Sequence, residues 1–415
     1  SSKDYIDDIK FRFGYGETGN QQIPNNRYSA MLTTQNSGLG SGFLVANSPN
    51  PDLRWESLQQ TDLGLDFTMF NSKLNFTIDF YQKKSKDFLF QVPLPLYLTG
   101  GGYQYGGIDA PYSNLGSMQN TGYDLNVAYN LISGDGFSWT ASANVSQYKN
   151  EILEIQDGLI VTAEVNTNGY IPYTVTNSVV GNPMSMFWGY KTDGLFQTLD
   201  QLNSAPLQFD QAVGTAPGET YLGDVKYVDV NGDGKINADD KTFIGNPHPT
   251  VTYGFTNTFK YKNFDCNIFF QVVYGNDIMN LTRRNGIMNS NLYTNQLVEA
   301  ANFWTPENTN TDIPRPEGNS NSNNLQISDR YIESGSYLRI QNFTFGYTLP
   351  LEMTSTVKIS KLRVYLTGQN LYTFTNYSGY DPEVGSVNQN ALLSGIDNGR
   401  FPTARTVLMG VNVEF

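Results

Sequence analysis

The sequence has little of what most enzymes use for chemistry. Its 415 residues include one cysteine, Cys266, and one histidine, His248. The cysteines and histidines that disulfide frameworks, zinc clusters and Ser-His-Asp or Cys-His catalysis require are therefore almost absent. Cys266 lies in an apolar run, where a small residue on a strand face is the plain explanation, and His248, between two prolines, is expected in a loop. With no evident pair of catalytic carboxylates either, the sequence argues against an enzyme.

Long apolar runs are also missing. No window of 18 apolar residues exists, and the richest stretch, 88–98, is broken by prolines, so a helical membrane span is excluded. Residues 1–5 have neither a basic segment nor an apolar core, so no signal peptide is expected within this sequence. An exported protein would have lost its N-terminal part, or this chain is a piece of a longer one. Only a β-barrel could place the chain across a bilayer.

Charge is scarce, whereas aromatic residues are abundant. Only 16% of the residues are charged, the formal net charge is -13, and no Lys/Arg cluster exists, which argues against nucleic-acid binding. The chain contains 27 Tyr and 25 Phe. This balance suits strands that face lipid on one side and a polar lumen on the other.

The last strand of the sequence shows the two-residue period that such a wall requires. Its odd-numbered positions from Val407 to Phe415 are apolar, and most of the intervening positions are polar or small. An alternating strand that stops on an aromatic residue is typical of a bacterial outer-membrane β-barrel.

Twelve segments carry the alternating pattern, without a composition break that would divide the chain into domains. Strands of about 9–11 residues suffice to cross a bilayer, and most of these segments are long enough. The predicted strands lie near 8–16, 56–70, 73–83, 119–131, 136–148, 171–180, 184–196, 249–261, 264–274, 336–349, 361–373 and 403–415.

The connections between these segments alternate in length. The short ones lie near 71–72, 133–135, 181–183, 262–263 and 350–360, and the long ones near 17–55, 84–118, 149–170, 197–248, 275–335 and 374–402. Short periplasmic turns and long extracellular loops define an outer-membrane barrel. Short and long connections alternate without interruption only if 171–180 is a strand, so we predict a strand there despite Pro172. A soluble β-sandwich or propeller is the alternative, but it rarely needs loops of about 40 to 60 residues on one side only.

Six short motifs are distributed along nearly all of the chain, and their combination in this order is specific enough to identify a family. They are FGYGETGNQ at 13–21, NPDLRWE at 50–56, GYKTDGLF at 189–196, GDVKYVD at 223–229, GQNLY at 368–372 and GYDPE at 379–383. With them the sequence resembles the C-terminal half of the SusC/RagA-like family of TonB-dependent outer-membrane transporters.

The resemblance implies a 22-stranded barrel filled by an N-terminal plug, a lid formed by a SusD-like surface lipoprotein, and import powered by the TonB complex. The twelve predicted strands make about half of such a barrel, and the whole of 1–415 is expected to belong to it. The plug, the TonB box and the first strands are not in these residues. The missing half is either another chain or was not included.

A twelve-residue run inside the predicted loop 197–248 matches a calcium-binding loop. Oxygen ligands at this spacing suit a hard cation, and Gly234 occupies the sharp-turn position 6. Position 12 is an aspartate where an EF-hand has a longer glutamate, and no flanking helices are evident, so the run resembles the dockerin-type variant. The alternative is an Asn/Asp/Gly turn without metal. The predicted ligands are Asp229, Asn231, Asp233, the carbonyl of Lys235, Asn237 and Asp240.

If calcium binds there, stapling a long extracellular loop is a plainer role than catalysis, because neutralised carboxylates offset the entropy of ordering the loop.

Aromatic residues in loops are the candidate ligand contacts. Tyr103 and Tyr105 belong to a Gly/Tyr-rich stretch that could stack on sugar rings or wrap an extended peptide, but could equally be a loop tip or a contact for the lid. Tyr377 and Tyr380 lie near the expected extracellular mouth, where an interfacial belt is the plainer explanation.

The patterns favour TonB-dependent import of a large nutrient across the bacterial outer membrane. A glycan oligosaccharide is the cargo that the resemblance implies most often, and an oligopeptide is the alternative within the family. A barrel that acts as an assembly or secretion scaffold without cargo is a different class, which a bound ligand in the lumen would rule out. A soluble carbohydrate-binding β-protein would dissolve without detergent.

Overall fold

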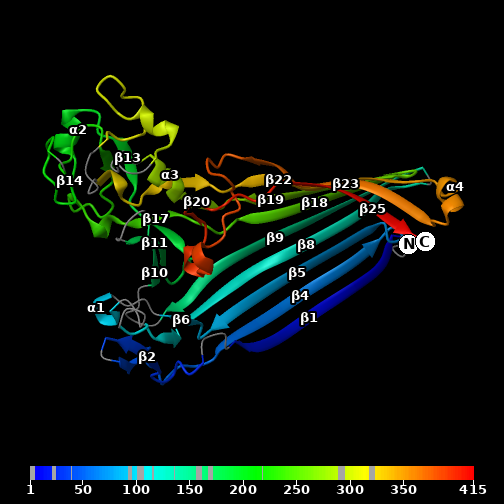
Figure 1. Ribbon diagram of the computed structural model, residues 1–415, viewed down its shortest axis with the longest axis horizontal. Coiled ribbons are helices and arrows are strands. Elements are labelled where there is room, and N and C mark those ends of the chain that lie inside the picture. The colour runs from blue at the N-terminus through cyan, green and yellow to red at the C-terminus, as the bar shows by residue number, and fades with distance from the viewer. Residues whose placement is uncertain are drawn as a thin grey trace.

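The computed structural model is dominated by one curved antiparallel sheet of ten long strands (Figure 1). It describes residues 5–20, 25–38, 40–91, 96–100, 107–114, 116–134, 136–155, 161–166, 172–216, 218–287, 295–316 and 323–415. Each strand pairs with the next in chain order, so the sheet is an up-and-down meander. The strands are β1 (Ile6–Asn20), β4 (Glu56–Met69), β5 (Leu74–Lys86), β8 (Gly116–Ser133), β9 (Phe137–Ile155), β18 (Val251–Tyr261), β19 (Phe264–Tyr274), β22 (Tyr337–Thr348), β23 (Lys361–Thr375) and β25 (Thr406–Glu414).

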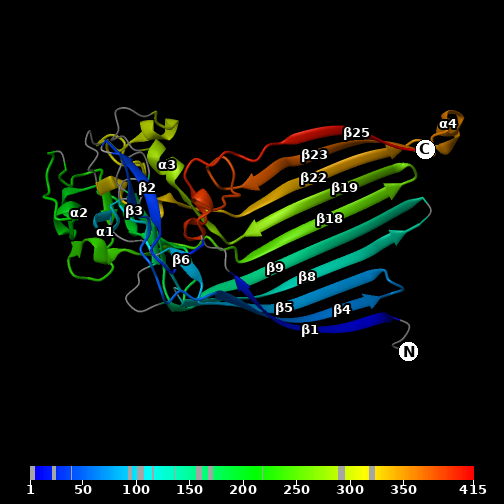
Figure 2. The same cartoon turned by 60° about the horizontal axis from the view of Figure 1, so that its bottom comes forward.

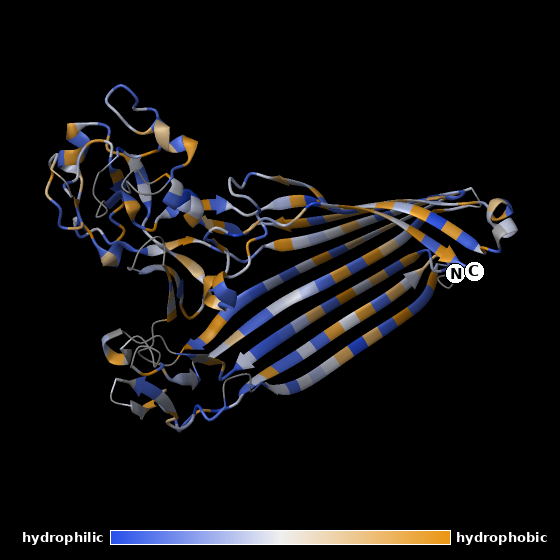
Figure 3. Ribbon diagram, in the orientation of Figure 1, coloured by the Kyte–Doolittle hydropathy of each residue, from blue (hydrophilic) through white to orange (hydrophobic). Residues whose placement is uncertain are grey.

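The two faces of this sheet differ in polarity, as the alternating bands in Figure 3 show. In the pairing register, Leu65 lies opposite Ile78, which lies opposite Leu125, so one face is apolar. On the other face, Asp66 lies opposite Thr77, which lies opposite Asn126. An apolar outer face and a polar inner face are what a membrane barrel wall requires. The predicted all-β transmembrane fold is confirmed.

Aromatic residues mark both ends of the apolar outer face. Phe80 and Tyr123 lie 6.2 Å apart, ring to ring, on the side of the long loops. Phe264 and Tyr347 lie 4.6 Å apart at the end of the short turns. Aromatic rings prefer the membrane–water interface, so these pairs delimit the lipid-facing band.

Two of the twelve predicted strands are not part of the barrel wall, and their prediction as membrane strands is wrong. Segment 171–180 forms β11 (Pro172–Ser178), and 184–196 divides into β12 (Met186–Gly189) and β13 (Thr192–Leu195). None is as long as the about 9 residues a crossing needs. Val175 and Phe187 are fully buried in a protein core and do not face lipid. β9 pairs directly with β18, and because the two segments drop out as a pair, the alternation of turns and loops is preserved.

The long connections at one end of the sheet fold into small structures of their own, which Figure 2 shows beyond the ends of the long strands. One is a four-stranded sheet in the order β10-β11-β12-β17. α4 (Leu351–Thr354) lies at the opposite end, between β22 and β23. The remaining strands and α-helices are β2 (Leu32–Ser37), β3 (Gly40–Val45), β6 (Leu89–Gln91), α1 (Leu96–Thr99), β7 (Tyr112–Asn114), β10 (Val161–Asn166), α2 (Leu199–Ser204), β14 (Leu207–Gln208), β15 (Val225–Tyr227), β16 (Lys235–Ile236), β17 (Thr242–Gly245), β20 (Asp277–Asn280), α3 (Leu281–Gly286), β21 (Ile332–Ser334) and β24 (Ile396–Asp397). No helix in the described ranges is long and apolar enough to span a membrane.

Three of these connections, 156–250, 275–336 and 376–405, share one hydrophobic core, and we call the unit that they form the loop domain. The core draws buried side chains from all three connections. A second cluster packs around Tyr190 and Trp304. The first core contains Val161, Ala163, Val165, Val175, Phe187, Met279, Leu281, Ile327, Leu392, Leu393 and Ile396.

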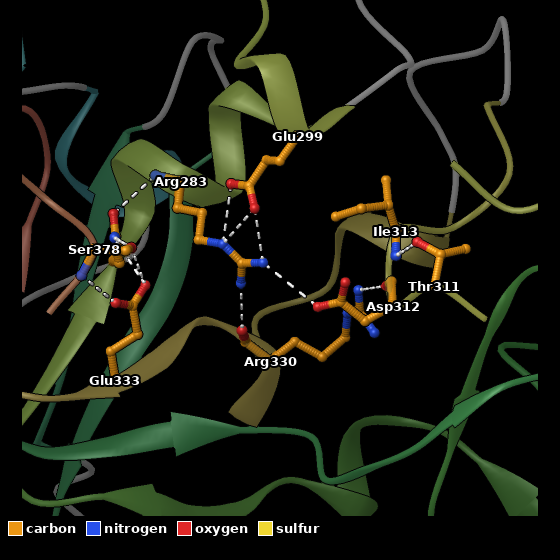
Figure 4. A network of polar contacts seen from close by, with 9 residues as sticks. Arg283, Glu299, Thr311, Asp312, Ile313, Arg330, Glu333 and Ser378 are labelled. Carbon is orange, nitrogen blue, oxygen red and sulfur yellow. Dashed lines mark hydrogen bonds and ion pairs between the residues drawn. The ribbon is translucent and has the colours of Figure 1, made fainter. Parts of the chain in front are cut away.

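A polar network ties the loop domain together (Figure 4). The Arg283 guanidinium donates to both carboxylate oxygens of Glu299, with the shortest contact at 3.1 Å, and lies 3.4 Å from the Asp312 carboxylate. Glu333 accepts from the hydroxyl and the backbone N–H of Ser378, each at 2.8 Å. Asn280 connects the two groups, because its side-chain oxygen accepts from the Arg283 N–H at 2.8 Å and its amide nitrogen donates to Glu333 at 3.0 Å. That nitrogen also donates to the Ser378 hydroxyl at 3.2 Å, so the network joins segments of the loop domain that are 98 residues apart.

Candidate functional site

The inner wall of the barrel carries a charged cluster at mid-height. Arg12 on β1 donates from Nε to the Asp66 carboxylate at 2.8 Å, and its Nη2 lies 2.8 Å from Asp79 on β5. Gly64 lies under this guanidinium, and a Cβ there would overlap both Arg12 and Asp79. The glycine thus lets one cation bridge two carboxylates flat against the wall.

A recess of about 400 Å³ opens beside this cluster. Asp62 and Asp124 also line it, and their side-chain hydrogen-bond partners among the described residues are neutral, since Asp62 accepts from Gln60 and Asp124 from Ser146. The inner wall of β1 to β9 is therefore polar and rich in carboxylates, which suits an aqueous lumen.

A buried arginine anchors the last loop to the mouth of the barrel. Arg339 on β22 is 2% exposed and contacts Asp381 at 2.5 Å and Glu383 at 2.6 Å. Both carboxylates belong to the GYDPE motif at 379–383, so the structure gives this motif a role as a loop anchor. Burial alone raises the pKa of Asp381, but the backbone N–H groups of Glu383 and Thr403, together with Arg339, outweigh it and hold that pKa below its usual range.

The four tyrosines predicted to contact ligand differ in their exposure and in whether the structure describes them. Tyr377 is buried, and its hydroxyl donates to Asp397 at 2.6 Å, so its side chain offers little surface to a ligand. Burial, followed by that carboxylate, raises the pKa of Tyr377. Tyr380 is 76% exposed and lines a recess of about 390 Å³ at the mouth. Tyr103 and Tyr105 lie outside the described residues.

The run 229–240 folds as a tight loop around its own carboxylates. Asp229 accepts from the backbone N–H of Gly232 at 2.7 Å and of Gly234 at 2.8 Å. Gly234 has a φ of 84°, a left-handed conformation that glycine adopts without strain. Asp240 is fully buried and accepts from the backbone N–H of Asn237 at 2.8 Å. The Gly234 N–H, ahead of opposing burial, lowers the pKa of Asp229.

The other predicted ligands follow the same pattern. The side-chain oxygens of Asn231, Asp233 and Asn237 each accept from the backbone N–H two residues further on. Ile236 packs in the second hydrophobic cluster, so the loop is fixed to the loop domain at the position after Lys235. Throughout the part of the chain that the structure describes, no three Asp, Glu, His or Cys side chains converge as a metal site would need. Calcium at this loop thus stays a prediction.

Sequence reasoning missed the contact between the barrel wall and the loop domain at His248. His248 Nε2 lies 2.8 Å from the Met184 carbonyl, and Nδ1 lies 3.2 Å from the hydroxyl of Tyr148 on β9. Burial lowers the pKa of His248. No sequence pattern indicates this contact, because the two partners of His248 lie 64 and 100 residues away from it.

Comparison with known proteins agrees with this architecture. The family model described as "TonB dependent receptor-like, beta-barrel" matches residues 4–272. The chain therefore belongs to the TonB-dependent receptor β-barrel family, a family of receptors and transporters and not of enzymes, whose barrels reside in the outer membrane. The resemblance drawn from the six motifs is confirmed.

Individual relatives are similar to this chain over almost its whole length. TonB-dependent receptor P3 of Formosa agariphila is 33% identical over 414 residues, which cover 98% of this chain and 39% of the relative. TonB-dependent receptor SusC of Bacteroides thetaiotaomicron is 28% identical, over 99% of this chain and 38% of the relative. A solved structure of the RagAB peptide transporter superposes with a TM-score of 0.77 at 26% identity, over 99% of this chain and 41% of that chain. The chain thus spans about two fifths of the length of these relatives.

Proposed function

We propose that this chain is the C-terminal part of a TonB-dependent importer that takes up a large nutrient. The observation that carries the proposal is the barrel wall itself, with a lipid-facing outside, a polar inside and a folded loop domain at one end. Membership of the TonB-dependent receptor family supports it. The long loops would face the cell exterior and the short turns the periplasm, as in other outer-membrane barrels.

The complete transporter would need parts beyond these residues. The N-terminal plug and the remaining barrel strands would close the lumen, and a SusD-like lipoprotein would cover the loop domain. The TonB complex would act through the N-terminal part. The matches to SusC and to RagAB, each over about two fifths of the longer protein, support this assembly.

The proposed cargo is an oligosaccharide, with an oligopeptide as the second candidate. An oligosaccharide is the cargo that the resemblance to the SusC/RagA-like family implies most often, and the relative named SusC is similar over 99% of this chain. The peptide alternative is supported by the RagAB peptide transporter, whose fold matches at a TM-score of 0.77. The exposed ring of Tyr380 beside the mouth recess would suit either, because an aromatic face packs on sugar rings and on apolar side chains alike.

The calcium loop would contribute stability and no chemistry. Calcium held by the carboxylates of Asp229, Asp233 and Asp240, with Asn231, Asn237 and the Lys235 carbonyl, would fix a surface segment of the loop domain. The buried Ile236 supports this, since it would transmit the tightening of the loop to the core behind it.

Native mass spectrometry of the complex extracted from outer membranes tests the import proposal. We expect a plug-containing polypeptide, a lipoprotein and a small ligand, whose mass and fragmentation identify it as glycan or peptide. A matched strain that lacks the transporter should lose uptake of that ligand. A complex without lipoprotein and ligand would overturn import and favour a scaffold.

A further inference from the structure

The outer face of the barrel wall carries three lysines, which lie on β5 and β9. Lys84 and Lys86 share a face with Phe80, because every second side chain of a strand points the same way. Lys149 lies on this face as well, by the pairing of β9 with β8, where Tyr123 points outward. Every other Lys and Arg of the ten strands lies on the inner face by the same register.

These lysines lie beyond the aromatic end of the lipid-facing band. Phe80 and Tyr123 mark that end on the side of the long loops. Lys84 follows Phe80 by four residues, so at about 3.4 Å per residue and a strand tilt of about 40° it lies about 10 Å beyond the rings. The headgroup layer adds about 5–8 Å on each side of the hydrocarbon core, and a lysine side chain bends readily toward it. The ammonium groups are therefore within reach of lipid headgroups.

The lysines are confined to one part of the wall. At the same end of β18, β19 and β23, the outward side chains include the exposed aromatic residues Tyr253, Tyr274 and Phe374. Outward cations occur in the ten strands only around β8 and β9, which are 18 and 19 residues long and continue beyond the lipid-facing band. A general preference for polar residues at the rim would not produce this confinement.

Lys84 and Lys86 border a recess of about 320 Å³. In the part of the chain that the structure describes, neither lysine has an ion-pair partner. Two carboxylates, Asp87 and Glu154, also line the recess. These carboxylates would repel a simple anion, but a phosphorylated sugar offers phosphate to the lysines and hydroxyl donors to the carboxylates.

The neighbours of the two lysines add hydrogen-bonding groups. Lys84 lies opposite Gln59 on β4 and Gln119 on β8. Lys149 lies 3.0 Å from the Glu151 carboxylate and therefore contributes less charge to the patch. Two available cations beside amide side chains suit a phosphate that is attached to a polar, hydroxyl-rich group.

We infer that Lys84 and Lys86 bind the phosphorylated sugar headgroup of a glycolipid in the outer leaflet of the membrane. The phosphate lies between the two ammonium groups, and sugar hydroxyls donate to Glu154. The acyl chains follow the apolar outer row of β5 past Phe80 and Ile78. One amphiphilic molecule thus covers both the cations and the rings next to them.

Native mass spectrometry of the full-length transporter, extracted from outer membranes in mild detergent, tests the site. We expect one phosphorylated glycolipid to stay bound to the wild type and to be largely lost from the double variant Lys84→Gln with Lys86→Gln. If the double variant loses its folded band in SDS, Lys84→Gln alone takes its place.

Lys83→Gln is the matched control, because Lys83 lies between the two lysines in sequence but faces the lumen. It should retain the glycolipid. Equal loss from this control, or a wild type without bound glycolipid, would overturn the inference.

Titration of the delipidated transporter identifies the chemistry that is recognised. The probes are lipid A, dephosphorylated lipid A, phosphatidylethanolamine and inorganic phosphate. We expect lipid A to bind at least about tenfold more tightly than each of the others, and the double variant to lose this advantage, because it lacks the charge-assisted hydrogen bonds to phosphate. Equally tight binding of any of the other three probes would overturn a phosphorylated glycolipid as the occupant.

Glu154→Gln tests the contact with the sugar. It should weaken the binding of lipid A, because an amide oxygen is a poorer acceptor than a carboxylate. Stronger binding by this variant would show that Glu154 repels the ligand, and would overturn the assigned hydroxyl contact.

This inference rests on the proposed function only for the orientation, in which the long loops face the cell exterior. It does not depend on the cargo, the lipoprotein or the TonB complex, so uptake is measured separately in intact cells. Bound glycolipid without nutrient uptake would support the lipid site and overturn import. Uptake without bound glycolipid would do the reverse.

Discussion

Single side chains at the mouth of the barrel decide whether the last loop stays in place. Arg339 is the cation that pairs with Asp381 and Glu383, and it is almost fully buried. Arg339→Met would leave the Asp381 carboxylate buried without its cation, which typically costs about 3–5 kcal/mol. We expect lower thermal stability and faster proteolysis within 376–405.

The double variant Arg339→Met with Asp381→Asn is the control for that prediction, because it removes the unpaired charge as well. It should recover part of the loss. Equal stability of the single and double variants would show that the ion pair does not hold the loop.

The same anchor should respond to acid. The folded pKa of Asp381 lies below its ordinary value of 3.8. A carboxylate of this kind contributes its full stability above the unfolded pKa and loses it as the pH falls through the folded pKa. We expect proteolysis within 376–405 to accelerate only below about pH 3.8. Asp381→Asn should remove this step, and a step that persists in Asp381→Asn would assign the effect to another group.

At the scale of the element, each barrel strand has one face in lipid and one in the lumen, and adjacent residues should respond oppositely to charge. Val127 and its neighbour Asn126 on β8 lie on the outer and inner face, respectively, because they pair with Phe76 and Thr77. Val127→Arg, near the middle of the apolar band, should destabilise the barrel by about 2–4 kcal/mol, as expected for a cation at the bilayer midplane. Asn126→Arg should cost far less. Denaturant unfolding in bilayers measures both, and equal costs would contradict the assigned faces.

The calcium loop gives a second prediction at this scale. If the loop binds calcium, a free concentration 100 times the Kd should stabilise the loop domain by about 2.7 kcal/mol. Chelation should therefore lower its thermal stability, and Asp233→Ala should abolish the difference. Magnesium serves as the control ion, because it demands a smaller octahedral site. No calcium-dependent shift in the wild type would leave the run as a metal-free turn.

The sequence identified long strands better than short ones. Ten predicted strands were correct because lipid on one side and lumen on the other impose a strict two-residue period. β11 and β12 were wrongly predicted as membrane strands, because a short strand in a protein core shows an apolar pattern similar to that of a lipid-facing strand. Only the fold shows that protein side chains, and not lipid, cover Val175 and Phe187. The ion pairs of Arg339 could not be predicted either, since sequence spacing does not show that residues 42 and 44 positions away will meet it.

At the scale of the whole molecule, the loop domain and the barrel wall are two units with separate sources of stability. The loop domain has its own buried core, whereas the wall is held by strand pairing and by lipid. Phe187→Ala should cost the loop domain about 3–5 kcal/mol and expose 172–250 to protease, while the folded barrel band in SDS is retained. Loss of both together would show a single cooperative unit.

The direction of the first and last strands constrains the rest of the protein. Both ends of the described chain lie at the end of the short turns (Figure 1). In a closed antiparallel barrel, the neighbour of β25 must start at that end, and the neighbour of β1 must finish there. In the longer barrel that we propose, the strands outside this chain would therefore be even in number, and a chain break before β1 would leave both new termini in one compartment. Two separately exported pieces could then associate into one barrel without either terminus passing through the membrane.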